Sequence, residues 1–282
     1  MVQRKIVADS SADTLQLEGM DFASVPLKVI AGNRTYVDDA STDPARMVEE
    51  LRTFKGKMST ACPGIYDYQE AFGDADEVLC ITISSALSGS NNAAQIAADD
   101  YQNAHPGRKV YVIDSLSAGA ELHLIIEKLA EMIGREMPFE DICREIEAYR
   151  KTTHVFFCLQ SLRNLASGGR ISPAVAALIG MLGIRIIGRG SESGELEPFA
   201  KCRGDRKALA EIVSKMKEMG YCGGRVIIDH CVNETLAASL RTLLRNAWED
   251  ADIILRPTRA LCSYYAEAGG LIIGFETSWA SV

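Results

Sequence analysis

The chain has 282 residues, a formal net charge of −8 and an isoelectric point near 5.2. No dense run of Lys and Arg appears, which excludes nucleic acid as a main partner, and an anionic membrane surface would repel the chain as a whole. With 47% hydrophobic and 24% charged residues, the chain is expected to form a globular protein with a sizeable core. We expect neither a signal peptide nor a membrane span, because the longest apolar run covers only residues 174–184, and so predict a soluble, cytoplasmic protein.

The first half of the chain alternates short β-branched runs with amphipathic stretches. Asp43 and Pro44 are typical of a helix start. The nearly uninterrupted apolar run at residues 77–84 indicates a strand covered on both faces. Strands are predicted at residues 5–8, 25–30, 35–37, 77–84, 109–114 and 154–159, and helices at 44–54, 91–101, 118–132 and 139–151.

The second half continues the alternation. We expect a helix from Ser172 to about Leu182 and a hairpin formed by residues 184–187 and 195–202. Repeated strand–helix–strand units predict an α/β fold with mainly parallel central sheets flanked by helices. We place an N-terminal α/β domain at residues 1–160 and a C-terminal α/β domain at 161–282. The remaining predicted elements are a helix at residues 205–219, a strand at 225–229, a helix at 237–247, and strands at 253–256 and 271–275.

The cysteines and histidines show no metal-binding spacing. The eight cysteines are scattered without a C-x-x-C pair, which is unlike a zinc ribbon and fits a reducing compartment. The four histidines show no H-E-x-x-H or other close spacing with carboxylates. We therefore expect no metal and no cofactor. His230, at the end of a predicted strand, is the histidine best placed for the edge of a site.

Four polar segments follow predicted strands, at the edge where α/β sheets bind ligands. The first, residues 8–13, contains Asp9, which acts either as a turn-forming cap or as a residue that orients nearby hydroxyls. The second, residues 57–64, contains the adjacent hydroxyls of Ser59 and Thr60. Taken alone, these two hydroxyls indicate a helix N-cap.

The third segment, residues 84–92, is a candidate anion site. The chain passes from a buried strand through Ser88, Gly89 and Ser90 into a helix at Asn91. Glycine lets backbone N–H groups turn toward a ligand, and a helix N-terminus carries partial positive charge. The segment is neither a Walker loop nor a G-x-S-x-G elbow. A carboxylate or phosphate is the expected ligand, and a capped loop is the alternative.

The fourth segment, residues 167–173, places Arg170 beside two glycines at a predicted helix start. A guanidinium in this position has two equally plausible roles. It contacts an anion or a partner, or it donates hydrogen bonds to nearby carbonyl groups.

Together these segments resemble the DegV family. Residues 6–13, IVADSSAD, are similar to its first strand and loop, and residues 83–90, ISSALSGS, to its S-S-x-L-S-G-T block. Residues 168–171, GGRI, resemble the G-G-R-[IV] segment, and residues 201–208, KCRGDRKA, resemble K-x-R-G-x-x-K-A. The resemblance extends in order over nearly the whole chain.

The resemblance implies a non-catalytic, two-domain α/β protein that holds one long-chain fatty acid between and within its domains. The acyl chain is expected in an apolar tunnel, mostly in the second domain, with walls such as the helix at residues 175–182. The carboxylate is expected near the domain junction. The implied partner is a separate ATP-dependent fatty acid kinase, which supplies ATP and metal and phosphorylates the carboxylate. Exchange of the lipid implies transient membrane contact.

By position, the resemblance assigns the carboxylate to Ser59 and Ser88, with Gly89 and Tyr265 beside them. Tyr265 stands where the family often has a histidine, and its phenol can still donate a hydrogen bond. The chain also departs from the family pattern at Met58 and Glu267. Further candidate ligand residues are Thr60, Ser90, Asn91, Asp9, Arg170 and His230.

Two other functions are compatible with the same segments. An acyl- or phosphoryl-transfer enzyme would use Ser88 or Ser59 as its nucleophile and would need a base within hydrogen-bond reach. A small-anion or nucleotide-binding protein would use the loop at residues 88–90, although that loop has no lysine and no glycine fingerprint.

Overall fold

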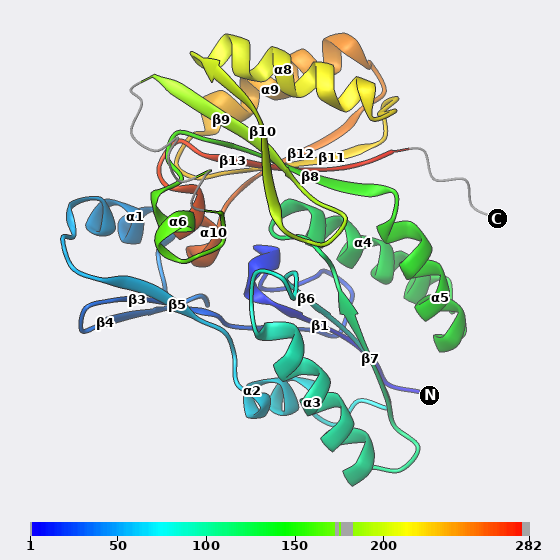
Figure 1. The fold of residues 1–282 in the computed structure, drawn as a ribbon. Helices are drawn as coiled ribbons and strands as arrows, with labels where there is room; N and C mark the ends of the chain where they lie inside the picture. The colour runs from blue at the N-terminus through cyan, green and yellow to red at the C-terminus, as the bar shows by residue number, and fades with distance from the viewer. Residues whose placement is uncertain (1, 173–174, 176–182, 278–282) are drawn as a thin grey trace.

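The structure, a computed structural model, describes residues 2–172, 175 and 183–277. Its strands form three sheets (Figure 1). Strand β6 is buried except for its first residue, which confirms the strand predicted to be covered on both faces. The first sheet is parallel, and its four strands lie in the order β2 (Phe22–Val25), β1 (Arg4–Asp9), β6 (Glu77–Thr82) and β7 (Lys109–Asp114).

Helices cover both faces of the parallel sheet. On one face, α2 (Ile65–Phe72) and α3 (Ser90–Ala104) pack against alternate strand residues, and α4 (Ala120–Gly134) and α5 (Phe139–Arg150) pack on the other face. The short 3-10 helix η1 (Ser10–Ala12) follows β1 at the carboxyl edge of the sheet.

The second sheet has six strands and corrects the expectation of mainly parallel pairing. Only the pair β11 and β12 is parallel, because α9 (Glu234–Ala247) supplies the crossover that a parallel connection needs. β9 and β10 form the predicted hairpin, and the last strand, β13, inserts between β8 and β11 in the antiparallel sense. The order is β10 (Leu196–Arg203), β9 (Ile184–Gly190), β8 (Thr153–Leu159), β13 (Leu271–Glu276), β11 (Arg225–His230) and β12 (Asp252–Pro257).

The third sheet is small and antiparallel, and sequence patterns identified it only in part. Residues 25–30 were predicted as one strand, but Pro26 interrupts them, so that β2 and β3 belong to different sheets. Ser59 and Thr60, whose hydroxyls taken alone indicated a helix N-cap, instead lie in β5. The strand order is β4 (Arg34–Val37), β3 (Lys28–Ala31) and β5 (Met58–Ala61), and α1 (Pro44–Thr53) packs beside them.

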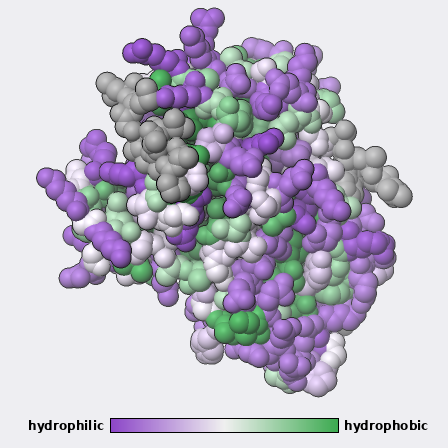
Figure 2. Space-filling model, in the orientation of Figure 1, coloured by the Kyte–Doolittle hydropathy of each residue, from purple (hydrophilic) through white to green (hydrophobic). Residues whose placement is uncertain are grey.

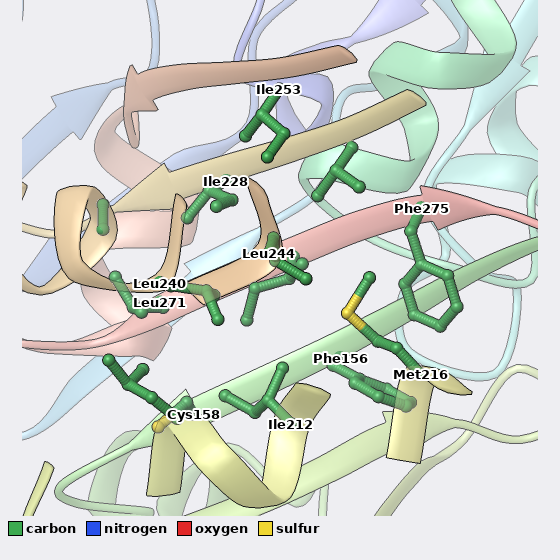
Figure 3. Packing of buried hydrophobic residues seen from close by; sticks show 14 of the residues in the cluster. Phe156, Cys158, Ile212, Met216, Ile228, Leu240, Leu244, Ile253, Leu271 and Phe275 are labelled. Atoms are coloured by element: carbon green, nitrogen blue, oxygen red, sulfur yellow. The ribbon is translucent and has the colours of Figure 1, made fainter. Parts of the chain in front are cut away.

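The outer face of the six-stranded sheet is filled by side chains. Figure 3 shows Phe156, Met216 and Phe275 among the residues packed between this sheet and the helices α8 (Asp205–Glu218) and α9. Because strand side chains alternate between faces, the residues next to Phe156 and Phe275 in sequence point the opposite way. That opposite face looks toward the parallel sheet.

Two short helices, α6 (Arg163–Ser167) and α10 (Ala260–Ala266), lie between the six-stranded and three-stranded sheets (Figure 1). Strand β8 lies before residue 160, where we placed the domain boundary, but it pairs with β13 and β9 of the six-stranded sheet. The boundary itself stays a prediction. The helix predicted from Ser172 to about Leu182 lies largely outside the described residues. Among the helices that the structure describes, none combines the length and apolar character needed to cross a bilayer.

Candidate functional site

Asp9 holds together the loops at the carboxyl edge of the parallel sheet. Its buried carboxylate accepts hydrogen bonds from the Ser90 hydroxyl (2.7 Å) and the Ile83 N–H (2.9 Å), and also from Ser11. Burial raises the pKa of Asp9, and these hydrogen bonds partly oppose the increase. The Ser90 hydroxyl also lies 2.6 Å from the phenol oxygen of Tyr68. Asp9 and Ser90 therefore position the loop that leads into α3.

An apolar cavity lies between this edge and the inner face of the six-stranded sheet. Its empty volume, including the part open to solvent, is about 730 Å³. Strand β8 contributes Val155, Phe157 and Leu159, whereas Phe156 and Cys158 face the filled core on the other side. The other apolar lining residues are Leu27, Ile83, Leu87, Ala118, Leu165, Leu196, Leu261, Ala266 and Ile272.

The junction between the sheets also exposes apolar residues. Figure 2 shows white and green, that is neutral and hydrophobic, residues in the middle of the molecule, and a further green patch in its lower part. The cavity lies in this junction: strands of the six-stranded and three-stranded sheets line it, together with residues that follow β6 and β7 of the parallel sheet.

Four polar side chains gather in one part of the cavity wall. The Thr60 hydroxyl lies 2.8 Å from the phenol oxygen of Tyr265, and the Arg170 guanidinium carbon lies 5.9 Å from the centre of the Tyr265 ring. Arg170 also donates from Nε to the Leu87 carbonyl (3.1 Å), next to Ser88. The predicted loop at residues 84–92 and the G-G-R segment thus meet here. None of the described residues that line the cavity is acidic.

Ser59 does not line this cavity, although it was assigned first to the carboxylate. It lies on the exposed face of β5, and Thr60 occupies the inward position instead. The register explains the difference: Thr60 pairs with the fully buried Val29, and Ser59 pairs with the less buried Ile30. A helix N-cap, which the two hydroxyls alone indicated, would not have fixed which of them points inward.

The remaining candidate residues lie around the cavity or away from it. Gly89 is exposed, and its φ of −72° is open to any residue, so its conformational freedom is not needed. The Asn91 side chain donates to the Thr82 hydroxyl (3.0 Å), and His230 Nδ1 accepts from the Asn233 N–H (3.4 Å). These contacts are structural and involve none of the residues that line the cavity.

Glu267 points away from the cavity that Tyr265 lines. Its carboxylate accepts a hydrogen bond from the Ser161 hydroxyl (2.8 Å) and lies 3.2 Å from the Arg163 guanidinium. Its negative charge is therefore partly compensated outside the cavity. Met58, the other departure from the family pattern, packs against the hydrophobic cluster beside α1.

Most of the apolar wall could not be recognised from the sequence. The alternation of Val155, Phe157 and Leu159 was visible in the sequence, but both faces of β8 are apolar, so the pattern could not distinguish core from cavity. Cys262 also lines the cavity, and burial raises the pKa of its thiol. Of the helix predicted to form the tunnel wall, only Val175 belongs to the described residues; it packs beside the cluster that contains Phe157.

Comparison with known proteins decides the family. Over residues 3–277 the chain matches the family model described as "Uncharacterised protein, DegV family". The chain belongs to the DegV family. A DegV domain-containing protein of Streptococcus pneumoniae is 40% identical over 276 residues, which cover 96% of this chain and 98% of the relative. The resemblance inferred from the motifs is confirmed.

Two solved DegV-type structures are similar over almost their whole length. A DegV family protein from Eubacterium eligens loaded with heptadecanoic acid is 42% identical, with a TM-score of 0.95 over 98% of this chain and 100% of that one. The Fatty Acid Kinase (Fak) B3 protein of S. pneumoniae, loaded with linoleic acid, is 39% identical, with a TM-score of 0.96 and the same coverage. The α/β class is confirmed, and both of these DegV relatives hold a long-chain fatty acid.

Proposed function

We propose that this DegV-family chain binds one long-chain fatty acid in the cavity between its sheets. The main support is that an apolar wall is combined with a single group of polar side chains, Thr60, Ser88, Arg170 and Tyr265. The carboxylate lies against this group, and the acyl chain lies along the inner face of the six-stranded sheet. The fatty acids held by the E. eligens and S. pneumoniae relatives support this assignment.

The energetics favour a long acyl chain. A saturated sixteen-carbon acid buries about fourteen methylenes, which contribute on the order of 11 kcal/mol before the costs of association. The carboxylate then needs hydrogen-bond donors to remain ionised in an apolar site. The hydroxyls and the Arg170 guanidinium meet that need, so the tail supplies affinity and the polar group sets orientation.

Head-group contacts give the first test. In delipidated protein, Tyr265→Phe and Thr60→Val should each weaken fatty acid affinity by roughly tenfold, because each removes a hydrogen-bonding group near a charge while keeping the shape of the side chain. Isothermal titration calorimetry with a long-chain fatty acid measures the change. Ser59→Ala is the matched control and should bind like the unaltered chain. A large loss from Ser59→Ala, with none from Tyr265→Phe, would place the carboxylate elsewhere.

The chain itself performs no chemistry on the bound acid in this proposal. No histidine or carboxylate occurs among the described residues that line the cavity, which leaves Ser88 without a neighbouring base. The Ser88 hydroxyl oxygen accepts a hydrogen bond from the Ser90 N–H (3.3 Å), as in a loop turn. Cytoplasmic location, and transient membrane contact for lipid exchange, belong to the same proposal.

The proposed partner is an ATP-dependent fatty acid kinase, as the description of the S. pneumoniae relative suggests. The kinase would phosphorylate the carboxylate held by the chain. Adding a bacterial fatty acid kinase and ATP to the loaded protein should yield acyl phosphate, detected by trapping with hydroxylamine. Turnover of free fatty acid at the same rate without this chain would contradict the partnership.

A further inference from the structure

A glycine in strand β9 makes room for an aromatic side chain of the cavity wall. Gly188 pairs directly with Phe157 of β8, and both residues are buried. A Cβ atom at Gly188 would lie 2.0 Å from Cζ of Phe157 and 2.6 Å from each of its two Cε atoms. These distances are far below contact distance, so the Phe157 ring lies directly over the backbone at Gly188. Glycine within a strand often marks such an approach.

The surroundings of Phe157 limit where its ring can go. On the far side of β8 its cross-strand neighbour is Ile272, which also lines the cavity. Behind the sheet, Phe156 and Ile187 belong to the filled core beneath α8 and α9. A side chain at position 188 would therefore displace the ring toward the cavity, which is the available space on this face.

We propose that the Gly188–Phe157 pair sets the dimensions of the acyl site and so determines which chain lengths the protein accepts. This inference rests on the proposed function, since it assumes that the cavity holds an acyl chain. With glycine at position 188 the tip of the ring lies over the backbone of β9, and the cavity keeps its depth. Any larger residue there lifts the ring into the path of the acyl chain.

The test compares affinities for saturated acids of twelve to eighteen carbons in the delipidated protein. Gly188→Ala should shift the preference to shorter acids, with about a fourfold loss of affinity for each methylene that the ring excludes. Phe157→Ala should shift it to longer acids. In the Phe157→Ala background, Gly188→Ala should have no further effect, because the ring it would displace is gone.

Gly134→Ala is the matched control, since a Cβ there meets no atom within 4 Å. This substitution should leave the chain-length preference unchanged. The inference would be overturned if folded Gly188→Ala kept the chain-length preference of the unaltered chain. It would also be overturned if Gly188→Ala shifted that preference equally with and without the Phe157 ring. Either result would leave the proposed function intact. Should Gly188→Ala fail to fold, Phe157→Leu must still shift the preference to longer acids, or the inference fails. Absence of binding by the unaltered chain would overturn the proposed function, and this inference with it.

Discussion

Arg256→Met is expected to lower the free energy of unfolding by about 3–5 kcal/mol. Arg256 in β12 donates from Nε and Nη2 to the fully buried carboxylate of Asp229 in β11, at 2.9 and 2.8 Å. Methionine fills similar space but leaves Asp229 buried without its counter-charge. Removing one partner of a buried pair costs far more than the intact pair contributes.

The same arginine also joins the two large sheets. Arg256 donates to the Thr14 hydroxyl (3.2 Å) and lies within hydrogen-bond reach of the Ala12 carbonyl (3.4 Å), both in the loop after β1. Asp13 lies in this loop as well. Burial raises its pKa, the charge of Asp229 raises it further, and Arg256 opposes the increase. Loss of Arg256 therefore also loosens the junction that encloses the cavity.

Urea unfolding followed by circular dichroism measures this change. Arg52→Met is the control, because Arg52 pairs with Glu49 on the surface, where both side chains are about two-thirds exposed. Exposed pairs contribute at most about 1 kcal/mol. If the two substitutions cost the same, the buried pair does not stabilise the junction as described.

Ala118→Trp is expected to abolish fatty acid retention, with a loss of affinity of about a hundredfold or more. Ala118 lines the cavity where Leu27, Ile83 and Leu261 pack together. An indole in place of the methyl group would occupy space that the acyl chain needs, and excluding only four methylenes already costs on the order of 3 kcal/mol.

Mass spectrometry of lipid extracted from the purified variant measures the retained acid. Ala104→Trp on the exposed end of α3 is the control for tryptophan itself and should retain as much lipid as the unaltered chain. A folded Ala118→Trp protein that still carries a full equivalent of long-chain acid would show that the acyl chain lies elsewhere.

Local sequence patterns predicted the strands and helices of this fold better than they predicted which strands pair with each other. The apolar run of β6, the cap formed by Asp43 and the hairpin of β9 and β10 depend on neighbouring residues, and each is present. The antiparallel insertion of β13 between β8 and β11 depends on pairing between distant segments. No local periodicity reports such pairing.

The same holds for the candidate site: its residues could be found from the sequence, but not which of two neighbours faces the cavity. The loop with Ser88, the arginine at position 170 and the tyrosine at 265 were identified as candidates, and all three line one cavity. The choice between Ser59 and Thr60 required knowledge that β5 pairs with β3, because only a strand fixes which of two adjacent hydroxyls points inward. The contact between Phe157 and Gly188 likewise exists only in the paired sheet.

The fatty acid content of the purified protein is the most direct test of fatty acid binding. Protein purified from bacteria without added lipid would be extracted with organic solvent, and its fatty acids quantified by gas chromatography against protein concentration. We expect about one long-chain fatty acid per chain. Protein that carries none, and that binds none when a long-chain acid is added, would contradict this expectation.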